Sequence, residues 1–374
     1  MLLPSIDDLG DVRGKRVLVR VDFNVPLADR DGEKVVTDDF RIQSALPLFR
    51  DLQLRGAHVT ACTHLGRPNG EVNAEYSVEP VRRHLNDLIE GVELLENLRF
   101  NPGEESNDRA YGEALTDSFD CYVNEAFGVS HREHASIMVP PTLIPSAAGP
   151  NLMREVATLT GLLQEPKRPF VAIVGGAKVA DKLGITKVLA EKADAVIVGG
   201  GMAFTFWRAQ GHTIGSSLVD ESRLADVSEL LNTGRVFIPT DVWALPTGEP
   251  FGSGGVLAPT LFEDDIPEGF AGLDIGPRSS EKFAEIIKTA GTVLWNGPMG
   301  VFEDPRLESG TRAVAEALVA SPAISVVGGG DSAAAVEQFG LADLMSFIST
   351  GGGASLELLE FGDLPGLKAL RGVE

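Results

Sequence analysis

The sequence predicts an α/β protein whose sheets are mostly parallel, and two observations carry this prediction. Short runs rich in valine and isoleucine alternate along the chain with segments of helical periodicity. Most of these apolar runs also end in small or polar residues. Strands and helices that alternate at this spacing favour a parallel sheet covered by helices. In such folds, ligands bind at the carboxyl ends of the strands.

Each element is expected from its own stretch of sequence. The strands expected first are 15–22, 57–64 and 120–126. The later strands are expected at 169–174, 193–198, 292–295, 323–327 and 345–349. Helical periodicity lies between them at 42–54, 78–89, 181–190, 281–290 and 311–319. The Gly- and Pro-rich stretch 241–265 is expected to be the longest loop.

The length of 374 residues predicts two domains. Two proline-rich breaks, 140–150 and 164–169, bracket the helical segment 151–163. A helix between two such breaks is typical of a connection between domains. We therefore expect a boundary near 150–168.

The charge balance excludes several classes of protein. Lys and Arg number 32 against 54 Asp and Glu, which gives a formal net charge of -22. Such a surface opposes nonspecific binding to nucleic acids and to anionic membranes. No signal peptide pattern and no apolar run of about 20 residues is present. We expect a cytoplasmic protein without nucleic-acid or membrane partners, in which Cys62 and Cys121 are buried and reduced.

Four expected strands are each followed by a glycine cluster and then by a helical segment. Glycine lets the backbone approach a ligand closely, and a helix N-terminus adds partial positive charge. One such turn can be purely structural, but four at one sheet edge favour a polyphosphate or nucleotide site. Neither a P-loop nor G-x-G-x-x-G after a strand occurs. The clusters are Gly175-Gly176, Gly199-Gly200-Gly201, Gly328-Gly329-Gly330 and Gly351-Gly352-Gly353.

Charged residues accompany two of these clusters. Lys178 and Lys182 are four residues apart at an expected helix start, which would place both on one face. Cations oppose the dipole at a helix N-terminus, so the pair suggests a bound anion. Asp331 follows three glycines and either caps a helix or coordinates Mg²⁺ beside a phosphate.

The first part of the chain concentrates arginine. Of its fifteen basic residues up to position 150, thirteen are Arg and two are Lys. Any single arginine could form a surface ion pair, but as a group they suit a small, multiply charged anion. Histidines and the strand end Asp22-Phe23-Asn24 accompany them. The candidates at strand ends or turns are Arg20, Arg41, Arg67, Arg99, Arg132, His64, His131 and His134.

Nine motifs in order resemble those of the phosphoglycerate kinase family, from about Ile6 to Leu370. In the first part they are 20–26 (RVDFNVP), 64–68 (HLGRP), 96–100 (ENLRF) and 126–136 (AFGVSHREHAS). In the second part they are 175–183 (GGAKVADKL), 199–206 (GGGMAFTF), 295–303 (WNGPMGVFE), 328–332 (GGGDS) and 349–360 (STGGGASLELLE).

The resemblance implies a fold and an activity. The family has two Rossmann-like, three-layer domains that face each other across a cleft and are joined by a hinge helix. The implied domains are a phosphoglycerate-binding domain at 1–155, a nucleotide-binding domain at 156–358, and a C-terminal segment, 359–374, that packs back on the first. The implied reaction is reversible, Mg²⁺-dependent transfer of a phosphoryl group between 1,3-bisphosphoglycerate and ADP, giving 3-phosphoglycerate and ATP. In-line transfer would follow hinge closure around 151–169, in a monomer.

The resemblance also implies roles for matching residues. Catalysis is assigned to Lys178, Arg41, Gly351, Gly352 and Gly353. Binding of the phosphoglycerate is assigned to Asp22, Phe23, Asn24, Arg41, His64, Leu65, Gly66, Arg67, Arg99 and Arg132. Binding of the nucleotide is assigned to Lys182, Gly199, Gly200, Gly201, Gly272, Glu303, Gly329, Gly330, Asp331 and Ser332, with Asp331 as the Mg²⁺ ligand.

Two positions depart from the family pattern. Glu125 stands where Asp is usual, and Ser332 replaces the more usual Thr.

Two other classes of protein remain as alternatives. An NAD-dependent dehydrogenase would share the glycine turns but needs the missing fingerprint. A binding or scaffold protein of this fold should have lost charged site residues, yet Lys178, Lys182, Arg41 and Asp331 are present.

Overall fold

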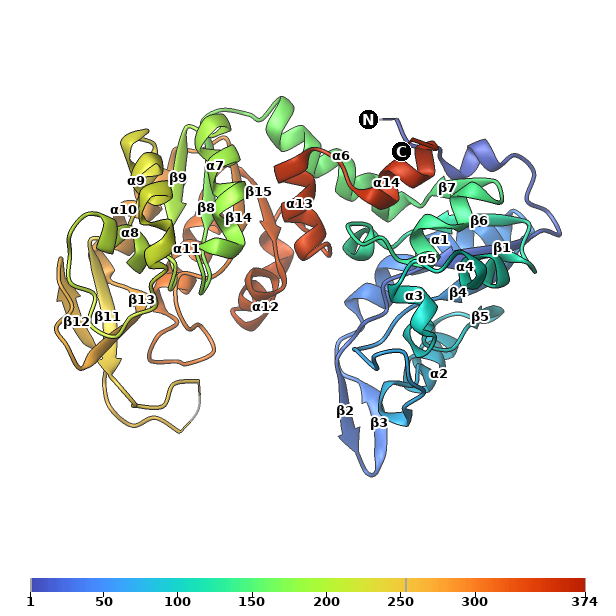
Figure 1. Cartoon of the computed structure of the whole chain (residues 1–374), viewed down its shortest axis with the longest axis horizontal. Helices are drawn as coiled ribbons and strands as arrows, with labels where there is room; N and C mark the ends of the chain where they lie inside the picture. The colour runs from blue at the N-terminus through green and yellow to red at the C-terminus, as the bar shows by residue number, and fades with distance from the viewer. Residues whose placement is uncertain (1, 253, 374) are drawn as a thin grey trace. The chain divides into compact units, whose positions relative to one another are not determined.

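The computed structural model describes residues 2–252 and 254–373 (Figure 1). The chain divides into two compact units. Unit 1 consists of Met1–Thr158 and Phe361–Glu374, and unit 2 consists of Leu159–Glu360. Each unit is built on its own parallel sheet, so the α/β class with parallel sheets flanked by helices is confirmed.

The sheet of unit 1 has five parallel strands in the order β5-β4-β1-β6-β7. Its central strands are buried because helices cover both faces, as parallel sheets require. The strands are β1 (Arg16–Arg20), β4 (His58–Cys62), β5 (Val92–Leu94), β6 (Cys121–Asn124) and β7 (Ser146–Ala148).

The two faces of this sheet differ in chemistry. Val17 and Val19 of β1 point into an apolar core with Ile42 and Phe49 of α1. The opposite face carries the fully buried Arg20, which contacts the α3 and α5 region. The helices of unit 1 are α1 (Phe40–Leu54), α2 (Glu79–Leu88), α3 (Pro102–Glu105), α4 (Arg109–Thr116), α5 (Ala135–Met138) and α14 (Pro365–Arg371).

Three further elements complete the description of unit 1. An antiparallel hairpin of β2 (Leu27–Arg30) and β3 (Glu33–Val36) extends away from the sheet (Figure 1). The C-terminal helix α14 contacts α5 and β7, and the Gly366 N–H donates to a backbone carbonyl of the turn after β6. Helix α6 (Pro150–Gln164) begins in unit 1 and continues into unit 2.

The sheet of unit 2 has six parallel strands in the order β10-β9-β8-β14-β15-β16. Every residue of β8, β9 and β14 is buried, which explains why these strands appear in the sequence as continuous apolar runs. The strands are β8 (Phe170–Val174), β9 (Ala195–Val198), β10 (Val236–Phe237), β14 (Thr292–Asn296), β15 (Ile324–Gly328) and β16 (Phe347–Ile348).

Helices cover this second sheet as well. Val171 and Trp295 pack against Phe283 of α10 and Val314 of α11 in one apolar core. Alternate residues of the same strands point to the other side, where α7 contacts β9. The helices of unit 2 are α7 (Leu183–Lys192), α8 (Ala203–Ala209), α9 (Leu224–Asn232), α10 (Pro277–Lys288), α11 (Ser309–Ala320), α12 (Gly330–Gln338) and α13 (Gly353–Phe361).

The expectation of one long loop at 241–265 is wrong. Two strands lie within this stretch, β11 (Asp241–Pro246) and β12 (Thr260–Glu263), and both belong to an antiparallel sheet with β13 (Phe270–Ile275). The buried Val242 and Ala244 of β11 supply an apolar face. The glycines and prolines on either side of these strands dominate the local pattern and concealed them.

Short 3-10 helices connect the main elements. They are η1 (Ile6–Leu9), η2 (Ala74–Tyr76), η3 (Leu98–Phe100), η4 (Phe127–Val129), η5 (Pro140–Thr142), η6 (Ala180–Lys182), η7 (Glu221–Arg223) and η8 (Ala342–Leu344). Among the described helices, none has the length and apolar character needed to span a membrane. Both cysteines are buried and free, as expected.

The polar network behind β1 allows the effect of a substitution on the free energy of unfolding to be predicted. Glu104 is fully buried and accepts hydrogen bonds from the Ser136 N–H (3.0 Å) and hydroxyl (2.7 Å), while Arg20 lies 3.9 Å away. Glu104→Ala would leave the buried guanidinium without its counter-charge, so we expect a loss of about 3–5 kcal/mol in urea unfolding. Glu113→Ala, at an exposed ion pair, should change stability by less than about 0.5 kcal/mol. Equal unfolding midpoints for the two variants would contradict this assignment.

Candidate functional site

The carboxyl edge of the unit 2 sheet gathers the predicted glycine clusters. Because all six strands are parallel, the turns that follow them lie along a single edge. All four clusters follow strands, as expected. A fifth turn begins at Gly297, directly after β14, and its backbone φ of 99° requires glycine. The turns that follow β8, β14 and β15 are neighbours there.

Lys182 places a partly buried cation at this edge. Its Nζ donates to the carbonyl oxygen (3.1 Å) and to the side-chain Oδ1 (2.5 Å) of Asn296, the last residue of β14. A Cβ on Gly297 would lie 2.6 Å from this Nζ, so the glycine makes room for the ammonium. Burial lowers the pKa of Lys182 to about 8, and the nearby carboxylate of Asp331 opposes that shift. The ammonium and the Asp331 carboxylate therefore lie close enough to interact.

The start of α12 arranges Asp331 and Ser332 differently. Gly329, with φ at 89°, is the N-cap, so the N-cap alternative for Asp331 is wrong. Asp331 is instead the second helical residue, and it is exposed. Ser332 is fully buried, and its Oγ accepts the Gly297 N–H at 2.6 Å. This hydrogen bond links the turn after β14 to the start of α12.

The expectation that Lys178 and Lys182 share one helix face is wrong. Helix α7 begins only at Leu183, and the 3-10 turn η6 precedes it. Lys178 lies in the non-helical turn that follows Gly176, whose φ of 128° directs the chain away from a helical path. Lys178 is exposed, and its ammonium pairs with no group in the described part of the chain.

Six of the predicted glycines fall into two groups. A Cβ on Gly199 would meet Met299 Sδ at 2.4 Å, and one on Gly272 would meet the Phe204 ring at 2.2 Å, so close packing explains both residues. Gly200 and Gly201 are likewise packed against the turn at 176–177. A Cβ on Gly330 or Gly352 would meet nothing within 4 Å. Only this second group leaves open space beside the backbone.

The other predicted residues of unit 2 lie at the same edge. The Gly351 N–H donates to Ser349 Oγ at 3.1 Å, and α13 begins at Gly353. Glu303 is exposed on the segment that follows β14. Asn296 was not predicted from the sequence as a site residue. A polar residue at the end of an apolar strand, as in Asp22-Phe23-Asn24, was the available signal.

In unit 1, five predicted residues form a connected group at the carboxyl ends of β1 and β4. Arg41 Nη1 contacts Asp22 Oδ2 at 2.9 Å and the Asn24 carbonyl at 3.3 Å. Asn24 Oδ1 accepts the Gly66 N–H at 2.9 Å, and Arg99 donates to the Gly66 carbonyl at 2.8 Å. These hydrogen bonds hold two arginines beside two strand ends.

Histidines lie beside these arginines and are held neutral. Burial, followed by the charge of Arg132, lowers the pKa of His131 to about 4. Burial and Arg99 lower that of His134 to about 3, and burial and Arg20 hold that of His64 well below its usual value. The neighbouring arginines therefore add to burial in disfavouring the charged form of these rings.

The remaining predicted residues of unit 1 have distinct positions. Arg67 and Arg132 are exposed, and the described residues offer neither of them an ion pair. Phe23 and Leu65 are buried, so only their backbones can reach a ligand. Arg20 donates to Ser136 Oγ (2.9 Å) behind the sheet. Its full burial excludes it from direct contact with an anion.

Glu125, the departure noted in the sequence, lies at the start of α6. Its carboxylate accepts the backbone N–H groups of Asn151 (3.1 Å) and Leu152 (3.4 Å). Burial raises its pKa to about 8. A Cβ on Gly149 would lie 2.0 Å from Glu125 Oε2, so the glycine gives this longer side chain its room.

No group of three or more potential metal-ligating side chains occurs among the described residues. Asp331 could still hold a hard divalent cation, because Mg²⁺ needs only one or two carboxylates when phosphate oxygens and water complete its shell. Its exposure and its position beside Lys182 fit such a role.

These features are typical of α/β proteins that bind phosphorylated ligands at the carboxyl edges of parallel sheets. The family model described as phosphoglycerate kinase matches residues 6–94 and 90–361. The chain belongs to the phosphoglycerate kinase family. It catalyses reversible phosphoryl transfer between 1,3-bisphosphoglycerate and ADP, a step of glycolysis.

Individual relatives agree over nearly the whole chain. The phosphoglycerate kinase of Rubrobacter xylanophilus is 48% identical, with 98% of this chain and 97% of that protein covered. That of Herpetosiphon aurantiacus is 45% identical, with 96% of both covered. The solved structure from Coxiella burnetii has a TM-score of 0.86 at 36% identity and covers 99% of both chains. The structure from Pyrococcus horikoshii OT3 has a TM-score of 0.84 at 29% identity and covers 99% of this chain and 98% of that one.

A buried carboxylate supports the turn that carries Glu303. Asp274 Oδ2 accepts the Ser309 hydroxyl (2.9 Å) and the Gly310 N–H (2.8 Å) at the start of α11. A Cβ on Gly300 would lie 2.2 Å from Asp274 Oδ1. Burial raises the pKa of Asp274 to about 7.

This shift makes a prediction about stability and pH. The folded state favours neutral Asp274, so its contribution is fully present below the unfolded pKa of about 3.9 and is lost as pH rises through 7. Asp274→Asn cannot ionise. Its unfolding free energy relative to the unmodified chain should therefore rise between pH 5 and 8, by on the order of 1–4 kcal/mol. Urea unfolding at several pH values measures this difference, and a constant difference across the range would refute the assignment.

Proposed function

We propose that the carboxyl edge of the unit 2 sheet binds Mg-ADP or Mg-ATP. The observation that carries this proposal is the Lys182 ammonium, held on Asn296 beside Asp331 and among glycine turns. Polyphosphate oxygens would approach the ammonium and the N–H groups at the open Gly330 turn. Close packing shapes the neighbouring surface at Gly199, Gly200, Gly201 and Gly272. The exposed Glu303 carboxylate is available to accept hydrogen bonds from the ribose hydroxyl groups.

The arginine group of unit 1 binds the phosphoglycerate in this proposal. Arg41 and Arg99 are already positioned by hydrogen bonds, whereas Arg67 and Arg132 have guanidinium groups available for phosphate or carboxylate. Asp22 and Asn24 orient Arg41, and Asn24 also fixes Gly66. Backbone groups of Phe23 and Leu65 and the neutral ring of His64 complete the surroundings.

Transfer of the phosphoryl group needs positive charge and alignment more than proton chemistry. Charge in the transition state spreads over the three equatorial oxygens of the transferring group. Lys178, Arg41 and the backbone N–H groups of the turn Gly351–Gly352–Gly353 would stabilise those oxygens. No general base is required, because the carboxylate that leaves an acyl phosphate is already a weak base.

Mg²⁺, held by Asp331, would neutralise charge on the nucleotide phosphates. The residues for phosphoglycerate and for nucleotide lie in different units, so transfer requires the units to close and exclude water. The hinge is proposed at 151–169 together with the returning C-terminal segment. We further propose a cytoplasmic monomer.

Lys178→Ala tests the catalytic assignment. We expect kcat to fall by about 10²- to 10³-fold, as on removal of one preorganised cationic or N–H partner of the transition state. The KM for 3-phosphoglycerate should stay nearly unchanged. Lys192→Ala, at the exposed end of α7, is the matched control and should leave kcat unaltered. Unchanged turnover in Lys178→Ala would remove this residue from the mechanism.

The experiment that tests the whole proposal is a coupled assay for ADP formed from ATP. Turnover should require 3-phosphoglycerate and Mg²⁺ together. Binding of both substrates without turnover would favour the alternative of a binding protein. Thermal stabilisation by NAD but not by ADP would favour a dehydrogenase.

Closure predicts compaction in solution. With 3-phosphoglycerate and a nucleotide both present, the radius of gyration from small-angle X-ray scattering should decrease relative to the free chain. Each ligand alone provides the control and should produce a smaller change. An identical radius of gyration in all four samples would contradict hinge closure.

A further inference from the structure

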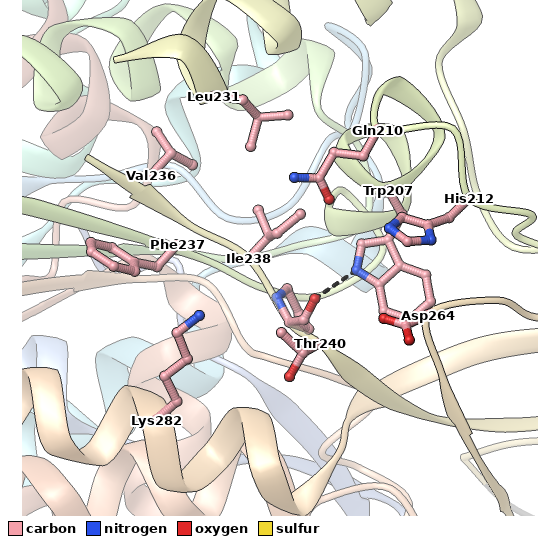
Figure 2. A pocket seen from close by; sticks show the side chains of 11 residues that line it. Trp207, Gln210, His212, Leu231, Val236, Phe237, Ile238, Thr240, Asp264 and Lys282 are labelled. Atoms are coloured by element: carbon pink, nitrogen blue, oxygen red, sulfur yellow. Dashed lines mark hydrogen bonds between the residues drawn. The ribbon is translucent and has the colours of Figure 1, made fainter. Parts of the chain in front are cut away.

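Unit 2 also contains a concave site that lies apart from the turns described above. A cavity of about 250 Å³ lies beside the edge strand β10, at the C-terminal end of α8 (Figure 2). This volume is below the roughly 300–1,000 Å³ of pockets for drug-sized ligands, so a small molecule would fill it. None of its lining residues belongs to the proposed phosphoglycerate or nucleotide sites.

Apolar side chains form part of the cavity wall. Ile238 is buried at 8% exposure, and Leu231 and Val236 lie nearby in the same wall. The Trp207 indole Nε1 donates to the Pro239 carbonyl at 2.7 Å, which fixes the indole ring and satisfies its polar atom. An aliphatic segment of a ligand would contact this surface without leaving a buried donor unpaired.

One side of the cavity carries a single available cation. Lys282 of α10 holds its ammonium 5.8 Å from the centre of the Phe237 ring. Among residues 2–252 and 254–373, no carboxylate pairs with this ammonium. Figure 2 shows Lys282 and Phe237 together on this side. The ammonium could therefore bind an anionic group of a ligand.

The opposite side is acidic. Figure 2 places Asp264 beside Trp207 and His212, away from Lys282, and the His212 ring lies 5.5 Å from the Trp207 ring. Glu263 and Asp265 flank Asp264 in the chain. Arg278 interacts electrostatically with Asp264, but its guanidinium forms its ion pair with Glu263, at 2.6 Å. The Asp264 carboxylate thus stays available to a cationic group.

We propose that this cavity binds a small linear zwitterion, with a carboxylate at Lys282, an ammonium at Asp264 and an aliphatic middle along Ile238. Because Figure 2 shows Lys282 and Asp264 on opposite sides of the cavity, the two charges of the ligand would lie at its opposite ends. An ω-amino acid and a short peptide with free termini share the required chemistry.

The test uses the full-length chain and isothermal titration calorimetry. The probe 5-aminopentanoate should bind with saturation, and pentanoate or pentylamine, which lack one charge each, should bind at least about tenfold more weakly. Trialanine carries the same terminal charges on a peptide. Tighter binding of trialanine than of 5-aminopentanoate would identify a peptide as the ligand, and the reverse would identify an ω-amino acid.

Two variants locate the site. Lys282→Met and Asp264→Asn should each weaken the probe by about tenfold or more, while Lys288→Met, on the same helix, should not. Both variants should keep kcat for phosphoryl transfer and the thermal unfolding midpoint, which separates loss of binding from misfolding. Failure of both zwitterions to saturate would overturn the proposal. The proposal would also be overturned if pentanoate bound as tightly as 5-aminopentanoate. The same holds if neither Lys282→Met nor Asp264→Asn changed the affinity for 5-aminopentanoate.

Discussion

The contact between the Lys182 ammonium and Asn296 organises the carboxyl edge of unit 2. Lys182 arrives from the segment after β8, and Asn296 ends β14. The next residue, Gly297, is held by the Ser332 hydroxyl at the start of α12, after β15. Three neighbouring strands therefore meet around one partly buried charge. Burial disfavours that charge and lowers its pKa. An anion bound at this edge would offset it.

Unit 1 follows the same topological rule with different chemistry. Its parallel strands also direct their following turns to one edge, but arginine replaces glycine as the dominant residue there. The guanidinium fork suits carboxylate and phosphate groups of a small substrate, whereas open backbone and helix N-termini suit a longer polyphosphate. In the proposed function, the two units would therefore use different groups to recognise their anions, on two similar sheets.

The sequence predicted the parallel strands well, because burial on both faces leaves continuous apolar runs such as β8 and β14. It failed at β11 and β12, since the turn residues around them dominate the local pattern. At the site, strand ends identified Asp22 and Asn24 correctly as members of one connected group. The path of the chain at Lys178 was not predictable, because it depends on a positive φ at Gly176 that composition alone does not specify.

The neutral histidines of unit 1 have a consequence for the energetics of ligand binding. Burial and the nearby arginines hold the pKa values of His131 and His134 near 4 and 3. A multiply charged anion placed among those arginines would cancel part of their repulsion and raise both values. At acidic pH, near these pKa values, complex formation would then be coupled to proton uptake from the solvent. The enthalpy observed by calorimetry would accordingly vary with the heat of ionisation of the buffer.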